Sequence, residues 1–212
     1  MYKLYGSRGS GSAAIEVALT RCGVPYAVTR ASSWEADSAI EELAKVNPLR
    51  QIPTLLLPDG SVISESAAIL IHLGLCHPDA GLLAVAASQR AQQMRGLVFI
   101  AANCYSAVSI SDFPERWCKD PDEASNNRVR AAARAQLHRN WEIFADIFPA
   151  TPWLSGNTPG ALDCLAAVVS KWSGTRAHIA AARPVFLQTL LAIEGHPDVA
   201  PVFERHWASA TK

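Results

Sequence analysis

The hydrophobic pattern of this chain changes once, near Gly74, and the change divides its 212 residues into two regions of different architecture. Before Gly74, short apolar runs typical of strands alternate with stretches of helical spacing. After Gly74 the strand pattern disappears, and apolar residues recur three and four positions apart. This pattern predicts an α/β domain followed by an all-α domain.

The first region predicts the element order βαβ-α-ββα. The expected elements are a strand at 3–5, a helix at 15–22, a strand at 26–29, a helix around Ile40 and Leu43, strands at 54–57 and 62–64, and a helix carrying Ile69, His72 and Leu73. Gly23-Val24-Pro25 ends the first helix, and the turn Pro58-Asp59-Gly60-Ser61 makes the last two strands a hairpin. We expect a first domain of residues 1–76, a linker of 77–87 and an all-helical domain of 88–212.

Composition excludes several classes of partner. The 19 basic and 19 acidic residues balance, so there is no overall field to attract nucleic acid or anionic lipid. The apolar runs fall short of the roughly 20 residues that span a bilayer. The N-terminus enters a strand directly, without the basic and apolar segments of a secretory signal. We therefore expect a cytoplasmic protein without a nucleic-acid or membrane partner.

The five cysteines are an odd number and include no C-x-x-C pair. A disulfide framework and a zinc site are therefore disfavoured, and we expect no metal. Cys22, Cys104 and Cys164 lie in helical patterns, where free cysteine usually acts as a small buried apolar residue. We assign no cysteine as a nucleophile.

A glycine- and serine-rich loop, Gly6-Ser7-Arg8-Gly9-Ser10-Gly11-Ser12, lies between the first expected strand and helix. Its glycines permit close backbone approach, and the helix N-terminus favours a negative charge. The loop lacks the ending of a phosphate-binding loop and the glycine order of a dinucleotide site. Taken alone, it is equally well a flexible capped turn.

A more specific motif is the run 47–54, Asn-Pro-Leu-Arg-Gln-Ile-Pro-Thr, with Glu65-Ser66 beyond the hairpin. A proline at the start of a strand often follows a cis bond, so we expect Ile52-Pro53 to be cis and Ile52 to pair with an extended peptide. Ser66 is expected to cap the next helix, with Glu65 facing an ammonium group. By themselves Glu65 and Ser66 would be only a helix start.

These residues closely resemble the glutathione-binding half of glutathione transferases, and the all-α region that follows resembles their second domain. The resemblance implies a thioredoxin-like N-terminal domain, a helical C-terminal domain and a homodimer. Glutathione would be a co-substrate, and no other cofactor is implied. Ile52 and Pro53 would bind its cysteinyl part, and Glu65 and Ser66 would receive its γ-glutamyl end.

Members of this family place tyrosine, serine or cysteine in the first loop to activate the thiol. The cysteine position of the bacterial beta class falls on Gly11, so the resemblance to the serine types points instead to Ser10, with Ser12 and Ser7 as alternatives. Ionising a thiol at neutral pH requires lowering its pKa by roughly 2 units, about 2.7 kcal/mol. One hydrogen bond to the charged sulfur contributes about 1.5–3 kcal/mol, so no base is required.

The electrophile is expected between the domains, near Asn103, Tyr105 and Ser106, with Trp117 as a further wall. The beta class carries a histidine and a lysine where this chain has Tyr105 and Ser106. A helical tyrosine is more often a packing residue, although its hydroxyl would suit an oxygen-bearing substrate. His72 and His138 are interpreted as surface or packing residues.

The segment before Asp163 resembles the family's buried helix start, which usually has serine or threonine three residues earlier. Gly160 stands at that position, so the reciprocal side-chain cap is lost, and Asp163 is expected to bond the preceding loop. We expect its role to be structural.

The leading functional hypothesis is conjugation of the glutathione thiolate to small hydrophobic electrophiles. The alternatives are glutathione-dependent peroxide or disulfide reduction and a non-catalytic glutathione-binding module. Disulfide exchange through an enzyme cysteine is disfavoured, because residues 5–16 contain none.

Overall fold

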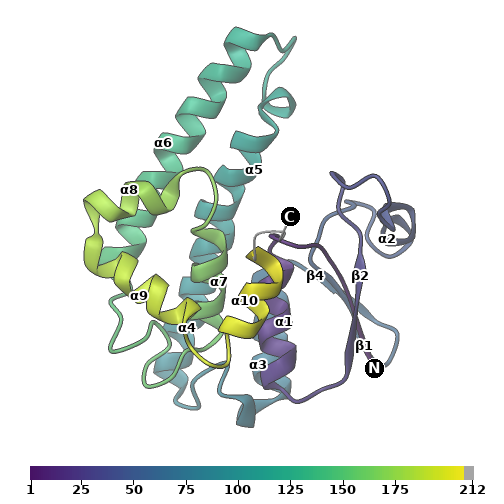
Figure 1. Ribbon diagram of the computed structural model, residues 1–212, viewed down its shortest axis with the longest axis vertical. Coiled ribbons are helices and arrows are strands. Elements are labelled where there is room, and N and C mark those ends of the chain that lie inside the picture. The colour runs from purple at the N-terminus through teal and green to yellow at the C-terminus, as the bar shows by residue number, and fades with distance from the viewer. Residues whose placement is uncertain (208–212) are drawn as a thin grey trace.

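The computed structural model describes residues 1–207 and has a four-stranded sheet on one side and a group of helices on the other (Figure 1). The sheet region contains β1 (Tyr2–Gly6), α1 (Ser12–Arg21), β2 (Tyr26–Arg30), α2 (Ile40–Val46), β3 (Thr54–Leu56), β4 (Val62–Ser64) and α3 (Ser66–Cys76). The helical region contains η1 (Pro78–Ala80), α4 (Ala87–Phe99), η2 (Ile100–Tyr105), α5 (Ser106–Asp112), η3 (Pro114–Trp117), α6 (Glu123–Ile147), α7 (Ala161–Val169), α8 (Thr175–Ala182), α9 (Pro184–Glu194) and α10 (Ala200–Trp207). The prediction of a thioredoxin-like α/β region followed by helices is confirmed.

The sheet has the order β2-β1-β3-β4, with β1 parallel to β2 and the other neighbours antiparallel. Leu4 pairs with Leu55, and both are fully buried. Tyr5, the next residue of β1, belongs instead to a small cluster with Leu43 of α2. Because successive side chains of a strand point to opposite faces, β1 divides its apolar residues between α2 on one face and the main core on the other.

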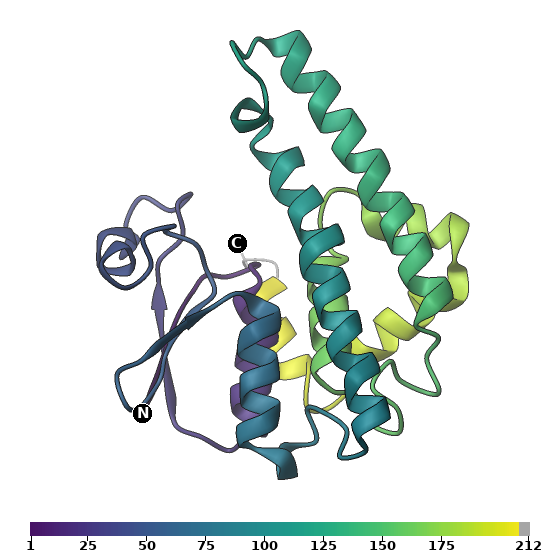
Figure 2. The same ribbon diagram turned by 180° about the vertical axis from the view of Figure 1, so that it is seen from behind.

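Helices α1 and α3 lie between the sheet and the helical region (Figure 2). Both pack against α7, whose nine residues are all buried. A helix that is apolar apart from one residue, Asp163, and buried on every side belongs in the interior. The main core is therefore continuous from the sheet to the helices.

Asp163 near the start of α7 is confirmed as a structural group. Its carboxylate accepts hydrogen bonds from the backbone N–H groups of Leu154, Ser155 and Gly160 at 2.8–2.9 Å. A Cβ on Gly160 would lie 2.6 Å from the Ser155 hydroxyl and 2.8 Å from the Leu82 carbonyl. Close packing therefore explains why a serine or threonine cap is missing here.

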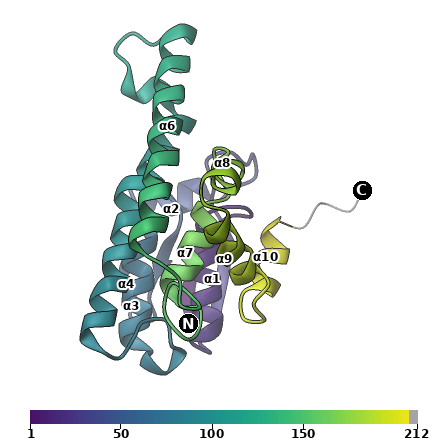
Figure 3. The same ribbon diagram turned by 90° about the vertical axis from the view of Figure 1, so that its left-hand side faces the viewer.

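One helical stretch, Ala87–Asp112, is long and apolar enough to cross a membrane by length and composition. Its middle is a π-helical segment, η2, and Leu97, Ile100 and Cys104 are fully buried against the other helices. One side of the stretch therefore packs into the core of this fold, while Val98 is exposed. Beyond it, α6 extends past the other helices (Figure 3).

Candidate functional site

The loop from Gly6 to Ser12 joins β1 to α1, and its three serines are buried together. The Ser10 hydroxyl donates to the Ser7 carbonyl at 2.7 Å and lies 2.9 Å from the Ser12 hydroxyl, which is 3.2 Å from the same carbonyl. The backbone N–H of Ser7 points back at both hydroxyls, at 3.4 and 3.3 Å. The serine hydroxyls thus hold the loop in one shape.

This arrangement bears on the expected role of Ser10. Its hydroxyl hydrogen is donated within the loop, so donation to a sulfur would require exchanging that bond. A serine hydroxyl has only one hydrogen to donate. The assignment of Ser10 to the glutathione sulfur, with Ser12 and Ser7 as alternatives, stays a prediction.

Glu35 anchors the loop from outside the sequence motifs. Its carboxylate accepts from the Ser7 hydroxyl at 2.7 Å and the Ser32 hydroxyl at 2.6 Å, and it pairs with Arg30 at 2.5 Å. Arg30, followed by the two hydroxyls, lowers the pKa of Glu35 to about 2. At neutral pH an ionised Glu35 therefore holds the loop through its bond with Ser7.

Two residues from the C-terminal part of the chain, Trp172 and His206, contact the same loop. Gly9 donates its N–H to Nδ1 of His206 at 3.1 Å, and its carbonyl accepts from the indole N–H of Trp172 at 3.3 Å. Because Nδ1 of His206 accepts, its Nε2 carries the hydrogen and donates to Glu16 of α1 at 2.7 Å. Sequence reasoning missed these residues, since no motif connects them to the loop.

A cavity of about 540 Å³ lies beside this anchor, between the loop, β2 and α10. Ser7, Arg8, Glu16 and His206 are among its lining residues, whereas Gly11 and Glu65 are not. This cavity is therefore separate from the motif residues Pro53 and Glu65, which the sequence assigns to glutathione.

The segment before β3 is fastened by the two ends of its motif. The Asn47 side-chain amide donates to the Thr54 hydroxyl at 2.9 Å and to the Gln51 carbonyl at 3.2 Å. Thr54 donates to the same carbonyl at 2.8 Å. The Ile52-Pro53 bond is cis, which confirms that prediction. Ile52 is half-buried beside the small Tyr5 cluster.

Glu65 and Ser66 occupy the start of α3, but one prediction about them is wrong. Glu65 is the N-cap residue and Ser66 the first helical residue, and no side chain of the described residues caps this end. Glu65 has φ of 69° and ψ of 115°, a region that residues with a Cβ rarely adopt. The Ser66 hydroxyl has no hydrogen-bond partner among the described residues. The polar groups here are left open, next to a helix N-terminus that attracts anions.

Tyr105 reaches the loop from the helical region. A Cβ placed on Gly11 would lie 2.7 Å from the Tyr105 hydroxyl oxygen and 3.4 Å from Cδ of Pro53. The tyrosine ring packs edge-on against Trp172, with ring centroids 5.4 Å apart. Burial, followed by the nearby carboxylates of Glu65 and Asp112, raises the pKa of Tyr105 to about 12. Tyr105 therefore stays protonated at neutral pH.

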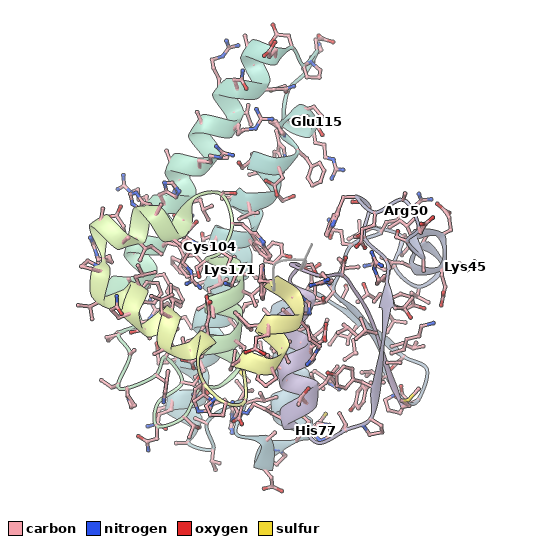
Figure 4. The ribbon with its side chains drawn as sticks, in the orientation of Figure 1. Lys45, Arg50, His77, Cys104, Glu115 and Lys171 are labelled. Atoms are coloured by element: carbon pink, nitrogen blue, oxygen red, sulfur yellow. The ribbon has the colours of Figure 1, made fainter. Side chains whose placement is uncertain are left out.

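The other residues expected at the electrophile are exposed. Asn103 donates its side-chain amide to the Phe99 carbonyl at 3.1 Å, and Ser106 donates to the Ala102 carbonyl at 2.5 Å. Trp117 is 62% exposed on η3, whose Glu115 is labelled near the outer end of the helical region in Figure 4. Of the four residues expected to contact the electrophile, Tyr105 lies beside the β1–α1 loop, whereas Asn103, Ser106 and Trp117 are exposed on the helical region.

Of the three cysteines expected to be buried packing residues, two are buried and the third is partly exposed. Cys104 and Cys164 are fully buried, and burial raises the pKa of Cys164 to about 12. Cys22 is half-buried rather than buried, and desolvation raises its pKa to about 11. Thiols with such raised pKa values are poor nucleophiles at neutral pH.

Comparison with known proteins places this geometry in a family. Residues 12–74 match the family described as glutathione S-transferase, N-terminal domain. The uncharacterized GST-like protein YncG of Escherichia coli K12 is 31% identical over 174 residues, covering 81% of this chain and 82% of that protein. Glutathione S-transferase GstA of Escherichia coli O157:H7 is 25% identical over 173 residues, with 81% and 82% covered.

The fold has close structural relatives as well. A glutathione transferase homologue from Sulfitobacter, solved with bound glutathione, superposes with a TM-score of 0.83 at 22% identity, covering 95% of this chain and 96% of that one. At that identity the likeness establishes the fold. Together with the 31% identity to YncG across four-fifths of both chains, it shows that this chain belongs to the glutathione S-transferase family.

Proposed function

We propose that this protein binds glutathione and transfers its thiolate to small hydrophobic electrophiles. The observation that carries the proposal is the open start of α3, where Glu65 has a rare backbone conformation and the Ser66 hydroxyl has no hydrogen-bond partner among the described residues. Rare backbone conformations of this kind persist where function requires them. The glutathione-bound relative supports the choice of ligand.

Glutathione is proposed to lie from α3 toward the β1–α1 loop. The Glu65 carboxylate would pair with its ammonium group, and Ser66 with the helix end would receive the γ-glutamyl carboxylate. The backbone of Ile52, beside Pro53, would pair with the cysteinyl residue. This path brings the sulfur over the loop, where Ser10, Ser12 and Ser7 are the proposed hydroxyl contacts.

The chemistry requires ionisation and positioning. The thiol proton leaves to solvent, the thiolate attacks an electrophilic carbon, and a carbon–sulfur bond forms as the leaving group departs, as a strained ring opens and its oxygen takes a proton from solvent, or as a C=N double bond becomes single and its nitrogen takes a proton from solvent. Holding both reactants together converts the encounter into an intramolecular step. Tyr105 is the proposed contact nearest the sulfur, and Asn103, Ser106 and Trp117 are proposed for the outer part of the electrophile.

We propose further that the protein is a homodimer. Leu75 of α3 and Val98 of α4 are 53% and 54% exposed on adjoining helices, although both are large and apolar. Burying such residues on association is favourable. Sedimentation at micromolar concentration is expected to give a dimer, and a monomer there would contradict this proposal.

The test of function has two parts. Calorimetric titration should show glutathione binding, and the thiolate absorbance of bound glutathione should titrate below the free thiol pKa of about 8.5. Glutathione-dependent turnover is then compared across aryl halides, epoxides, isothiocyanates, peroxides and mixed disulfides.

Each outcome has a clear meaning. Turnover of aryl halides, epoxides or isothiocyanates supports conjugation. Preferential turnover of peroxides or mixed disulfides would replace it with glutathione-dependent reduction. Binding without a lowered thiol pKa would identify a non-catalytic glutathione-binding module, and absence of binding would contradict the whole proposal.

A further inference from the structure

Gly11 is a glycine for reasons of space rather than backbone conformation. Its φ and ψ are −59° and −17°, which any residue adopts. A Cβ there would lie 2.7 Å from the hydroxyl oxygen of Tyr105 and 3.3 Å from Cε2 of its ring. The phenol therefore occupies the space above the loop that a side chain at position 11 would fill.

The hydroxyl that reaches this space is open. The Tyr105 hydroxyl has no hydrogen-bond partner among the described residues, although its ring is half-buried. The serine hydroxyls below it face one another and the Ser7 carbonyl. A donor is thus available on the helical side of the site, while those on the loop side are in use.

Two features fix the direction of Tyr105. It is the last residue of the π-helical segment η2, between α4 and α5, and π-helical turns occur frequently at functional sites. Its ring rests on Trp172, whose indole N–H is bonded to the Gly9 carbonyl of the same loop. Trp172 therefore contacts both Tyr105 and the loop. The position of Tyr105 relative to the loop is thus fixed before a ligand binds.

We propose that the Tyr105 hydroxyl, supplied by the helical domain, donates a hydrogen bond to the glutathione sulfur above Gly11. This inference rests on the proposed function and makes Tyr105, rather than Ser10, the principal side-chain donor. The thiol proton goes to solvent, and the phenol keeps its own proton while bonding the thiolate. Hydrogen bonds to an ionised partner are roughly twice as strong as neutral ones.

The state of the phenol suits this role. Burial disfavours the charged form of the phenol, and the negative charges of Glu65 and Asp112 add to that effect, so the pKa of Tyr105 is raised. The hydroxyl consequently remains a donor throughout the pH range in which the thiol ionises. A phenolate at this position would instead repel the sulfur.

The first experiment titrates the thiolate absorbance of glutathione bound to the wild type, Tyr105→Phe and Ser10→Ala proteins. Tyr105→Phe keeps the ring against Trp172, so the fold should be retained. We expect the pKa of the bound thiol to rise by about 1 unit or more, with about a tenfold loss of kcat near neutral pH that shrinks at higher pH. Tyr26→Phe is the matched control, because within residues 1–207 the Tyr26 hydroxyl bonds Thr20 alone.

The outcomes separate this inference from the proposed function. If wild-type protein binds glutathione and lowers its thiol pKa, but Tyr105→Phe leaves that pKa unchanged, Tyr105 is not the donor. A larger shift in Ser10→Ala than in Tyr105→Phe would return the role to the serine. If the wild type itself does not bind glutathione or lower its thiol pKa, the proposed function fails first.

A second experiment uses the crowding at Gly11. In the wild-type background, Gly11→Ala places a methyl group against the Tyr105 hydroxyl and should raise the bound thiol pKa by displacing it. In the Tyr105→Phe background the hydroxyl is absent, so the same change should shift the pKa at least threefold less. Equal shifts in both backgrounds would contradict the contact between Tyr105 and the sulfur.

Discussion

The β1–α1 loop and the start of α3, the two sides of the proposed glutathione site, differ in how far their polar groups are already hydrogen-bonded. In the loop, Ser7 is bonded to Glu35, and Gly9 is bonded to His206 and Trp172. At the start of α3, the Ser66 hydroxyl has no hydrogen-bond partner among the described residues, and Glu65 has a positive φ. The polar groups of the loop thus have their hydrogen-bond partners within the protein, whereas those at the start of α3 do not.

This difference divides the expected effects of mutation. Interactions already made in the protein contribute to folding, so changes in the loop's anchors should lower stability. Groups left open contribute when a ligand arrives, so changes at the start of α3 should alter glutathione binding with little effect on stability. The following predictions test this division.

The largest effect is expected from His206→Ala. The change leaves the Gly9 N–H without its acceptor and removes a partner from Glu16, which is 7% exposed. Leaving a buried N–H and a buried carboxylate each short of a hydrogen-bond partner should reduce the free energy of unfolding by about 3 kcal/mol. Urea unfolding measures this, with His72→Ala expected within about 0.5 kcal/mol of wild type. A similarly small loss for His206→Ala would show that the loop does not depend on α10.

The next effect is a pH dependence arising from Glu35. Because its pKa is lowered to about 2 from an ordinary 4.5, the unfolded state binds a proton first as pH falls. The stabilisation is present above about pH 4.5 and is lost as pH falls toward 2. Allowing for partial exposure, it should amount to about 2 kcal/mol.

Glu35→Gln removes this contribution. The difference in unfolding free energy between wild type and variant should be largest near neutral pH and should shrink between pH 5 and 3, whereas exposed Glu41→Gln should show little difference. A gap for Glu35→Gln that stays constant down to pH 3 would mean that the ionised Glu35 does not anchor Ser7.

Glu65→Gln tests the other region. Removing the charge proposed to face the ammonium should weaken glutathione binding by about tenfold, equivalent to about 1.4 kcal/mol, with a smaller change in kcat. Stability should change by less than about 0.5 kcal/mol. Titration calorimetry measures the affinity, steady-state turnover measures kcat and urea unfolding measures the stability, each compared with the exposed control Glu115→Gln. Unchanged affinity would place the γ-glutamyl end elsewhere.

The sequence predicted local features of the fold well. The alternation of periods indicated the sheet and its helices, and the run Asn47–Thr54 indicated a cis Ile52-Pro53 bond, because these signals lie within one element and its turns. The prediction that Ser66 caps α3 is wrong by one position, because Glu65 is the N-cap residue. The helix begins after the positive φ of Glu65, and a glutamate in the sequence does not predict such a backbone conformation.

The tertiary part of the site was not predictable in this way. His206 and Trp172 reach Gly9 across 197 and 163 residues of chain. The approach of Tyr105 to Gly11 depends on η2, where a π-helical turn changes the rotation of the helix relative to the 3.6-residue period used to interpret sequence. Such contacts follow from how helices pack, which local patterns do not encode.

The smallest predicted effect isolates the backbone of Glu65. Glu65→Gly and Glu65→Ala both remove the carboxylate, so both should weaken glutathione binding at least as much as Glu65→Gln does. Only glycine adopts a φ of 69° without steric cost, so Glu65→Gly should be about 1 kcal/mol more stable than Glu65→Ala. Thermal or urea unfolding of the pair measures this difference, and their shared loss of the side chain makes each the control for the other. If the two variants are equally stable, the start of α3 carries no strain, and the contrast with the loop reduces to hydrogen bonding alone. If glycine is more stable but binds glutathione as weakly as alanine does, the protein accepts a cost in folding to hold a carboxylate where the ligand needs it.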